Sequence, residues 1–237
     1  MRNIMEENGN KKNPPEEQFF SGPLTREDLQ DTIRRKVSRI SQEFRETFEF
    51  IRNYPRSVSI FGSARFNENN KHYEEARQLA GRIVRELGYT IFTGGGGGIM
   101  EGANRGAFEE GGKSVGLNIR LRREQELNRY TTDSIETYYF FVRKVGLSFA
   151  AEAYIFFPGG FGTLDEFFEI LTLVQTRKIR AVPIILVGSD FWKPLDQFIK
   201  EELLGKHKTI NANECELYMI TDDEEKILEA IRKTPVH

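Results

Sequence analysis

The segment from Pro158 to Glu166 contains the residue types of an anion-binding turn, and it reads Pro-Gly-Gly-Phe-Gly-Thr-Leu-Asp-Glu. It follows the apolar run Ala153 to Phe157 and precedes the amphipathic stretch Phe167 to Gln175, an order that predicts strand, turn and helix. Glycines let backbone N–H groups approach an anion, and a helix N-terminus adds unpaired donors and a partial positive charge. The pattern favours a phosphate-binding turn; a glycine turn that only packs tightly is the alternative.

Glu166 adds a reactive group to this turn. A carboxylate in the first turn of a helix commonly offsets the helix dipole. Beside a bound phosphate it can also act on the molecule to which the phosphate is attached. Both interpretations are open from the residue pattern alone.

Two further glycine-bearing loops follow apolar runs. Gly62-Ser63-Ala64-Arg65 comes after Val58 to Phe61, and Gly94 to Gly98 comes after Tyr89 to Phe92. The five glycines resemble a dinucleotide fingerprint, but that fingerprint belongs at the first strand-to-helix turn and needs an acidic residue at the end of the next strand. Neither condition holds, and no Gly-Lys-Ser/Thr sequence completes a Walker motif. An NAD-dependent oxidoreductase is therefore disfavoured.

Charged residues stand close to these loops in the sequence. Arg143 and Lys144 open a predicted helix, Arg143 to Ala151, where a basic pair opposes the helix dipole and so favours a clamp for phosphate or substrate over a solvated surface pair. Glu124 and Gln125 lie in the polar loop 120–132, which is long for this kind of connection. These two residues form either a rim of the site or ordinary solvated surface.

The elements that must position these residues alternate along the chain. The predicted strands are Val58 to Phe61, Tyr89 to Phe92, Val115 to Ile119, Tyr154 to Phe157, Ile184 to Val187 and Leu217 to Ile220. The predicted helices between and after them are Tyr73 to Leu87, Ile99 to Phe108, Arg143 to Ala151, Leu164 to Gln175, Phe191 to Leu203 and Glu224 to Ile231. Unbroken apolar strands that alternate with helices predict a parallel sheet buried on both faces. We expect an α/β protein with a doubly wound, Rossmann-like sheet, which binds ligands beyond the carboxyl ends of its strands.

Length and composition limit the remaining possibilities. The chain of 237 residues is 38% hydrophobic, which suits one sizeable core. A net charge of −2 disfavours nucleic-acid polymers as partners. One cysteine and three dispersed histidines offer no metal site. The polar N-terminus lacks a signal-peptide core and no run is long enough to span a membrane, so we expect a cytoplasmic protein without a membrane partner.

The N-terminal region divides into two predicted parts. Residues 1–23 are polar and form a flexible arm, and residues 24–237 form a single nucleotide-binding domain. The domain begins with a long amphipathic helix, Leu24 to Arg52, for which Thr25 is the expected N-cap. Its apolar stripe, with an aromatic group on the later helices, predicts a homodimer or higher homo-oligomer. That group comprises Phe140, Phe141, Phe149, Phe167 and Phe168.

The loops, taken in order, resemble the Lonely Guy family of cytokinin-activating phosphoribohydrolases, also described as lysine decarboxylase-like. The resemblance rests on Phe61 to Arg65, Gly94 to Met100, Arg143-Lys144 and Pro158 to Glu166, and it extends from about Ser57 to Gly188. The long first helix and the stretch Leu171 to Thr176 resemble the larger bacterial branch. Compact members carry a Met-His pair shortly before the basic pair, where this chain has Phe140-Phe141-Val142, so the preferred base stays open.

The resemblance implies hydrolysis of the N-glycosidic bond of a nucleoside 5′-monophosphate, either AMP or a cytokinin riboside monophosphate, to a free base and ribose 5-phosphate. It assigns catalysis to Arg143 and Glu166. Substrate contacts are expected from Ser63, Gly95, Met100, Glu124, Lys144, Gly159, Gly160, Gly162, Thr163 and Thr172. No cofactor is expected, since no lysine occupies a motif that marks a pyridoxal phosphate enzyme. The alternative is a nucleotide-binding carrier or sensor on the same fold.

Overall fold

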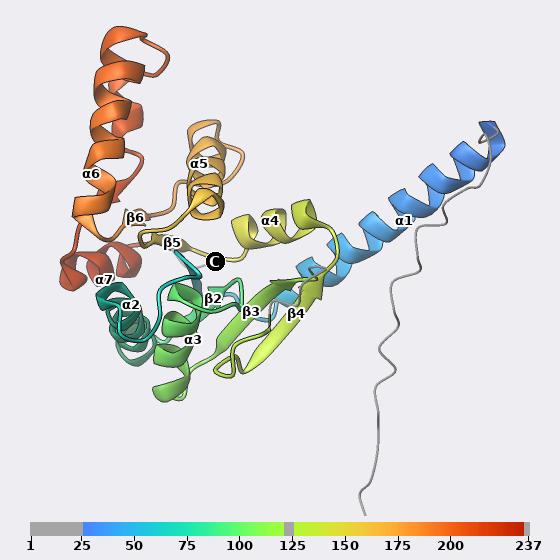
Figure 1. The fold of residues 1–237 in the computed structure, drawn as a ribbon, viewed down its shortest axis with the longest axis horizontal. Coiled ribbons are helices and arrows are strands. Elements are labelled where there is room, and N and C mark those ends of the chain that lie inside the picture. Colours follow the sequence, from blue (N-terminus) through green and yellow to red (C-terminus); the bar gives the residue numbers. More distant parts are fainter. Residues whose placement is uncertain (1–25, 121–125, 235–237) are drawn as a thin grey trace, which may run out of the picture. The chain divides into compact units, whose positions relative to one another are not determined.

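A computed structural model describes residues 26–120 and 126–234 of the chain. Seven parallel strands form one sheet in the order β4-β3-β2-β1-β5-β6-β7 (Figure 1). The strands are β1 Ser57–Phe61, β2 Thr90–Thr93, β3 Ser114–Ile119, β4 Asp133–Thr137, β5 Ala153–Phe156, β6 Ile184–Leu186 and β7 Met219–Ile220. The predicted α/β, doubly wound Rossmann-like architecture is confirmed.

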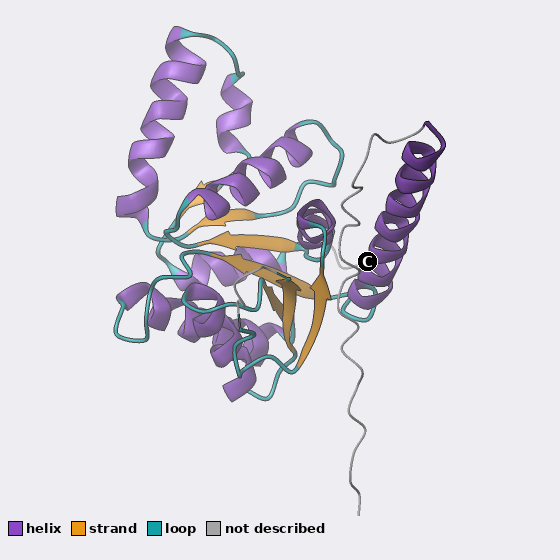
Figure 2. Cartoon of the chain, turned by 45° about the vertical axis from the view of Figure 1, so that its right-hand side comes forward, coloured by secondary structure: helices purple, strands orange, loops and turns teal. Residues whose placement is uncertain are grey.

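Helices cover both faces of the sheet (Figure 2). One face packs against α2 Lys71–Arg82, α3 Ile99–Glu109 and α7 Glu224–Arg232. The other packs against α4 Phe140–Phe149, α5 Phe161–Gln175, α6 Ser189–Phe198 and the last two residues of α1 Arg26–Ile51. Short π-helical segments, Ile83–Leu87 and Ile199–Lys206, continue α2 and α6, and a 3₁₀ helix covers Ala212–Glu216.

Alternation along each strand explains the two cores. In β5, Tyr154 and Phe156 point into the core shared with α5 and α6, whereas Ala153 and Ile155 point into the core shared with α2 and α3. All four residues are buried, as expected for a parallel strand covered on both faces.

The chain reverses its direction of winding between β1 and β5. From β1 it proceeds through β2 and β3 to β4, and it then returns to the other side of β1 to add β5, β6 and β7. Open α/β sheets bind ligands at such a switch point, beyond the carboxyl ends of the strands. The loops after β1 and β5 begin at Gly62 and Phe157, so two of the glycine-bearing loops stand at this point.

Two elements differ from the expectation. A strand that was not predicted, β4 Asp133–Thr137, forms the sheet edge, and α4 begins at Phe140 rather than at Arg143. Arg143 therefore lies one turn inside the helix, where the opposition between a positive charge and the dipole is weaker. Phe167 was expected among the surface aromatics, but it is fully buried between the sheet and the C-terminal helices.

The chain separates into two compact units, Met1–Arg39 and Ile40–His237. Within the first unit, α1 exposes Leu29, Ile33 and Val37 at roughly one-turn intervals. The proposed arm 1–23 and the N-cap Thr25 lie outside the described residues. No helix in the described ranges is both long and apolar enough to cross a bilayer.

Candidate active site

The backbone of Ser63 holds the three carboxyl-edge loops together. Its N–H donates to the carbonyl of Pro158 over 3.0 Å, and its carbonyl accepts from the N–H of Ile99 over 3.0 Å. Gly98 has a φ of 70°, and a Cβ there would overlap the Ser63 carbonyl, so glycine is required for this close approach. The loop after β1 is thus fastened to the loops after β2 and β5.

The glycine turn after β5 leaves its backbone accessible. α5 begins at Phe161 after the N-cap Gly160, and no side chain caps it. A Cβ at Gly160 or at Gly162 would have no neighbour within 4 Å, whereas a Cβ at Gly159 would collide with the Thr163 side chain. The first turn of α5 therefore offers open space beside helix N-terminal N–H groups, as an anion site requires.

Glu166 lies one turn further along α5 and is almost completely buried, with 5% of its surface exposed. Its Oε2 has no hydrogen-bond partner among the described residues. Burial raises the pKa of Glu166 to about 7, against the opposing charge of Arg143. A buried carboxyl group with a pKa raised toward neutrality is suited to proton transfer or to the stabilisation of a developing cation.

Arg143 faces the glycine loop after β2. Its Nε donates to the carbonyl of Leu117 over 2.9 Å, and a Cβ at Gly94 would overlap its Nη2. The same Cβ would lie 2.8 Å from Sδ of Met100, so Met100 and Arg143 both border Gly94. Burial lowers the pKa of Arg143, and Glu166 opposes that change; the guanidinium nevertheless stays charged.

Lys144 is engaged within the chain. Its Nζ lies 2.7 Å from Asp165 and 2.9 Å from Glu169, so it ties α4 to the part of α5 that carries Glu166. These contacts suit a residue that positions Glu166.

A buried polar network fixes the glycine loop and was not anticipated from the sequence. The amide of Asn128 donates to the carbonyl of Gly96 and to Oδ1 of Asn104, and its backbone N–H donates to the carbonyl of Gly95. Asn104 also bonds the hydroxyls of Thr93 and Ser114. The signal in the sequence is that small residues, Gly102, Ala103, Gly106 and Ala107, surround Asn104 and indicate a closely packed side of the helix.

The predicted site residues divide by position. Ser63, Gly95, Met100, Arg143, Gly159, Gly160, Gly162, Thr163 and Glu166 lie on the three connected loops or on the helix turns that face them. Thr172 is exposed nine residues after Thr163, about 13 Å along the helix, which is too far to share a phosphate with it in one chain. Glu124 lies outside the described residues.

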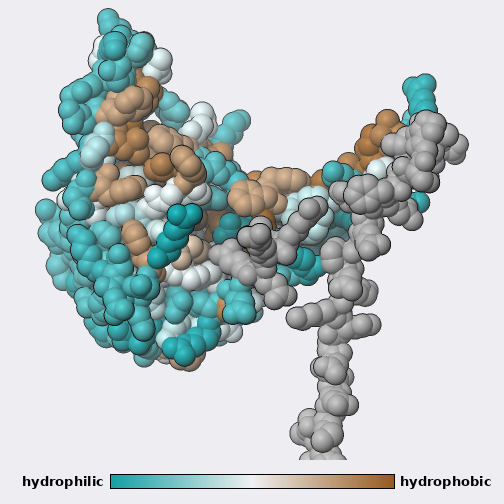
Figure 3. Space-filling model, in the orientation of Figure 1, coloured by the Kyte–Doolittle hydropathy of each residue, from teal (hydrophilic) through white to brown (hydrophobic). Residues whose placement is uncertain are grey.

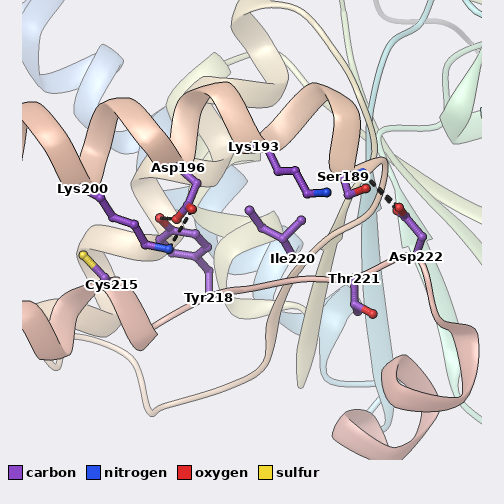
Figure 4. Close-up of a pocket in the computed structure, with 9 residues that line it drawn as sticks. All are labelled: Ser189, Lys193, Asp196, Lys200, Cys215, Tyr218, Ile220, Thr221 and Asp222. Carbon is purple, nitrogen blue, oxygen red and sulfur yellow. Dashed lines mark hydrogen bonds and ion pairs between the residues drawn. The ribbon is translucent and has the colours of Figure 1, made fainter.

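A cavity of about 480 Å³ lies elsewhere, between α6 and β7 (Figure 4). Its polar groups largely bond to one another. Tyr218 and Lys200 both contact Asp196 at 2.8 Å, and Asp222 accepts from the backbone N–H groups of Gly188 and Ser189. The glycine loops do not line this cavity, and its satisfied polar groups leave little for a ligand to recognise.

Fold and loops together define a Rossmann-like protein with an open, uncapped glycine turn and a buried acid. A family model described as possible lysine decarboxylase matches residues 100–231. The chain belongs to this family, the Lonely Guy family that its motifs resemble.

Two curated relatives are named for the same activity. A cytokinin riboside 5′-monophosphate phosphoribohydrolase of Rhodococcoides fascians is 25% identical over 148 residues, which span 62% of this chain and 75% of the relative. A probable enzyme of the same name from Arabidopsis thaliana is 30% identical over 138 residues, which span 57% of this chain and 67% of the relative. These names support the family assignment and leave the reaction of this chain to be proposed.

Solved structures share the fold. The X-ray structure of a structural genomics target has a TM-score of 0.57 at 21% identity, covering 75% of this chain and 99% of that chain. The molybdenum cofactor carrier protein of Chlamydomonas reinhardtii has a TM-score of 0.55 at 20% identity, covering 76% of this chain and 97% of that chain. At these identities the likeness concerns the fold alone.

Proposed function

We propose that the protein hydrolyses the N-glycosidic bond of a nucleoside 5′-monophosphate, of the AMP or cytokinin riboside monophosphate type, to a free base and ribose 5-phosphate. The observation that carries the proposal is the burial of Glu166, with a pKa near 7, one helical turn beyond an open, uncapped glycine turn. The names of the relatives support the same reaction.

In this mechanism the glycine turn positions the sugar. N–H groups at Gly160 and Gly162 and the hydroxyl of Thr163 bind the 5′-phosphate, which fixes the ribose relative to Glu166. Because the bound sugar is already fixed in position, it loses less entropy on reaching the transition state than a free sugar would.

Bond cleavage then requires charge stabilisation on both sides of the bond. As the bond from C1′ to the base breaks, its electron pair leaves with the base and positive charge develops on the ribose, which the ionised Glu166 stabilises. A water oxygen bonds to C1′ and releases a proton, for which a carboxylate with a pKa near 7 is a suitable acceptor. Arg143 contacts the phosphate or the departing base, and its guanidinium suits either contact.

The decisive experiment is incubation of the purified protein with a panel of nucleoside 5′-monophosphates, followed by chromatography for free base. Release of base together with an equal amount of ribose 5-phosphate is the expected result. Binding of a nucleotide without release of base would favour the carrier or sensor instead.

We also propose that the protein acts as a homodimer in the cytoplasm.

A further inference from the structure

A cavity of about 550 Å³ lies at the amino edge of the sheet, opposite the glycine loops. Residues around it, such as Ser57, Glu152 and Val182, stand at or just before the starts of β1, β5 and β6. Its volume falls in the range of small-molecule sites. The glycine loops leave the opposite ends of the same strands, so this cavity is separate from the proposed active site.

The floor of the cavity contains an incompletely paired carboxylate. Glu152 is 5% exposed, and its Oε1 lies 3.2 Å from Nη2 of Arg180. Its Oε2 has no hydrogen-bond partner among the described residues. A buried acceptor without a donor is unfavourable, so a ligand that brings an N–H group to this oxygen gains a bond that the empty cavity lacks.

The walls are apolar and the mouth is basic. Ile51, Tyr54 and Val182 are buried wall residues, which suit a flat apolar body. Arg52 and Lys178 also line the cavity, are exposed, and form no salt bridge within the described ranges. Positive charge at the mouth favours an anionic group on the part of the ligand nearest solvent.

We propose that this cavity binds a small organic anion with a flat ring body. An amino group attached to the ring donates a hydrogen bond to Oε2 of Glu152, and the anionic group lies near Arg52 and Lys178. An adenine nucleotide has this chemistry. A wholly apolar ligand would leave Oε2 unpaired, and a ligand with its anion inward would face the charge of Glu152. The proposal concerns binding alone and does not depend on hydrolysis at the glycine turn.

Calorimetric titration with AMP tests the proposal on the full-length Glu166→Gln variant, in which the proposed turnover is suppressed. We expect two classes of site per chain. Adding Gly162→Asp, which places a carboxylate in the open turn, should remove the class at the glycine turn only. If the proposed active site is wrong, only one class of site binds AMP. The affinity of that class is unchanged by Gly162→Asp and is lowered by Glu152→Gln.

Adding Glu152→Gln should weaken the second class at least about tenfold, because an amide N–H₂ replaces the acceptor that meets the ligand amine. The matched control is Glu216→Gln, the same change at an exposed carboxylate, and it should leave both classes intact. Purine riboside 5′-monophosphate, which lacks the exocyclic amine, should show a comparable loss at this site.

Lys178→Gln provides an independent variant at an exposed position and should also weaken this class, with a reduced dependence on salt. It decides the question even if Glu152→Gln fails to fold. A single class of site that is unchanged by Glu152→Gln or Lys178→Gln overturns the proposal. Equal binding of AMP and the analogue without the amine overturns it as well.

Discussion

Gly94 and Arg143 approach so closely that any side chain at position 94 would overlap the guanidinium. The absence of a Cβ at Gly94 is thus a condition for the position of Arg143 at the carboxyl edge of the sheet. The glycine run after β2 serves as a surface against which a charged side chain rests, in addition to any contact with a ligand.

Gly94→Ala should displace Arg143 and lower kcat on the best substrate by about a hundredfold, the effect of losing one preorganised electrostatic group. Gly97→Ala is the matched control, since the nearest atom to a Cβ there is 3.8 Å away. Steady-state kinetics of both variants provide the measurement. Equal kcat values would show that the position of Arg143 does not matter for turnover.

Glu166→Gln should retain nucleotide binding and lose on the order of a hundredfold or more in kcat, because an amide cannot stabilise a developing cation as a carboxylate does. Glu216→Gln, the same change at an exposed carboxylate outside the glycine loops, is the control and should leave kcat unchanged. Near-normal turnover in Glu166→Gln would remove Glu166 from the mechanism.

Stability should also depend on pH through Glu166. Its pKa is raised from 4.5 in the unfolded chain to about 7 in the native protein, so the native state holds the proton more tightly. Protonation of Glu166 contributes about 3 kcal/mol to the free energy of unfolding below pH 4.5. This contribution is lost as the pH rises through 7. Glu166→Gln removes this dependence, so its stability relative to wild type should increase between pH 4.5 and pH 8. Urea unfolding at both pH values measures the difference; an unchanged difference would contradict the raised pKa.

Turnover should require the 5′-phosphate. Adenosine leaves the glycine turn empty, so its kcat/KM should fall far below that of AMP. Gly162→Asp should produce a similar loss with AMP, because the carboxylate fits the open space there and repels the phosphate. If adenosine and AMP are cleaved equally well, the turn has only a structural function.

Self-association should bury the exposed aromatic surface. Phe140, Phe141 and Phe149 on α4 are each about half exposed, and Phe161 on α5 is 92% exposed. Figure 3 shows apolar side chains gathered in the region of α5 and α6. We expect light scattering at micromolar concentration to give at least twice the chain mass of 27.4 kDa, and a monomer mass would contradict the proposal.

The parts of the fold that depend on a local pattern are predictable from the sequence. The apolar runs and glycine turns predicted six strands of the sheet, because buried parallel strands read as unbroken hydrophobic segments. The edge strand β4 is not predictable in this way, because its residues are mostly exposed and its sequence Asp-Ser-Ile-Glu-Thr has one strongly apolar member. Pairing with β3 stabilises this strand, and such a tertiary contact leaves no periodic signal.

The polar support of the site was equally invisible in the sequence. Asn104 and Asn128 are 24 positions apart, and their mutual bond depends on how the loop after β3 folds back onto the glycines. Likewise, the sequence marks Lys144 as a candidate site residue but gives no sign of its contacts with Asp165 and Glu169 on a different helix.

The hydrogen bonds of Ser63 have a mechanical consequence. The N–H and the carbonyl of Ser63 belong to consecutive peptide groups, and together they link the turn after β5 to the first residue of α3. A displacement of Ser63 would lengthen both bonds, so the glycine turn after β5 and the loop that faces Arg143 are constrained to move together. Amide hydrogen exchange at Ser63 and at Ile99 is therefore expected to slow in parallel when a ligand occupies either loop.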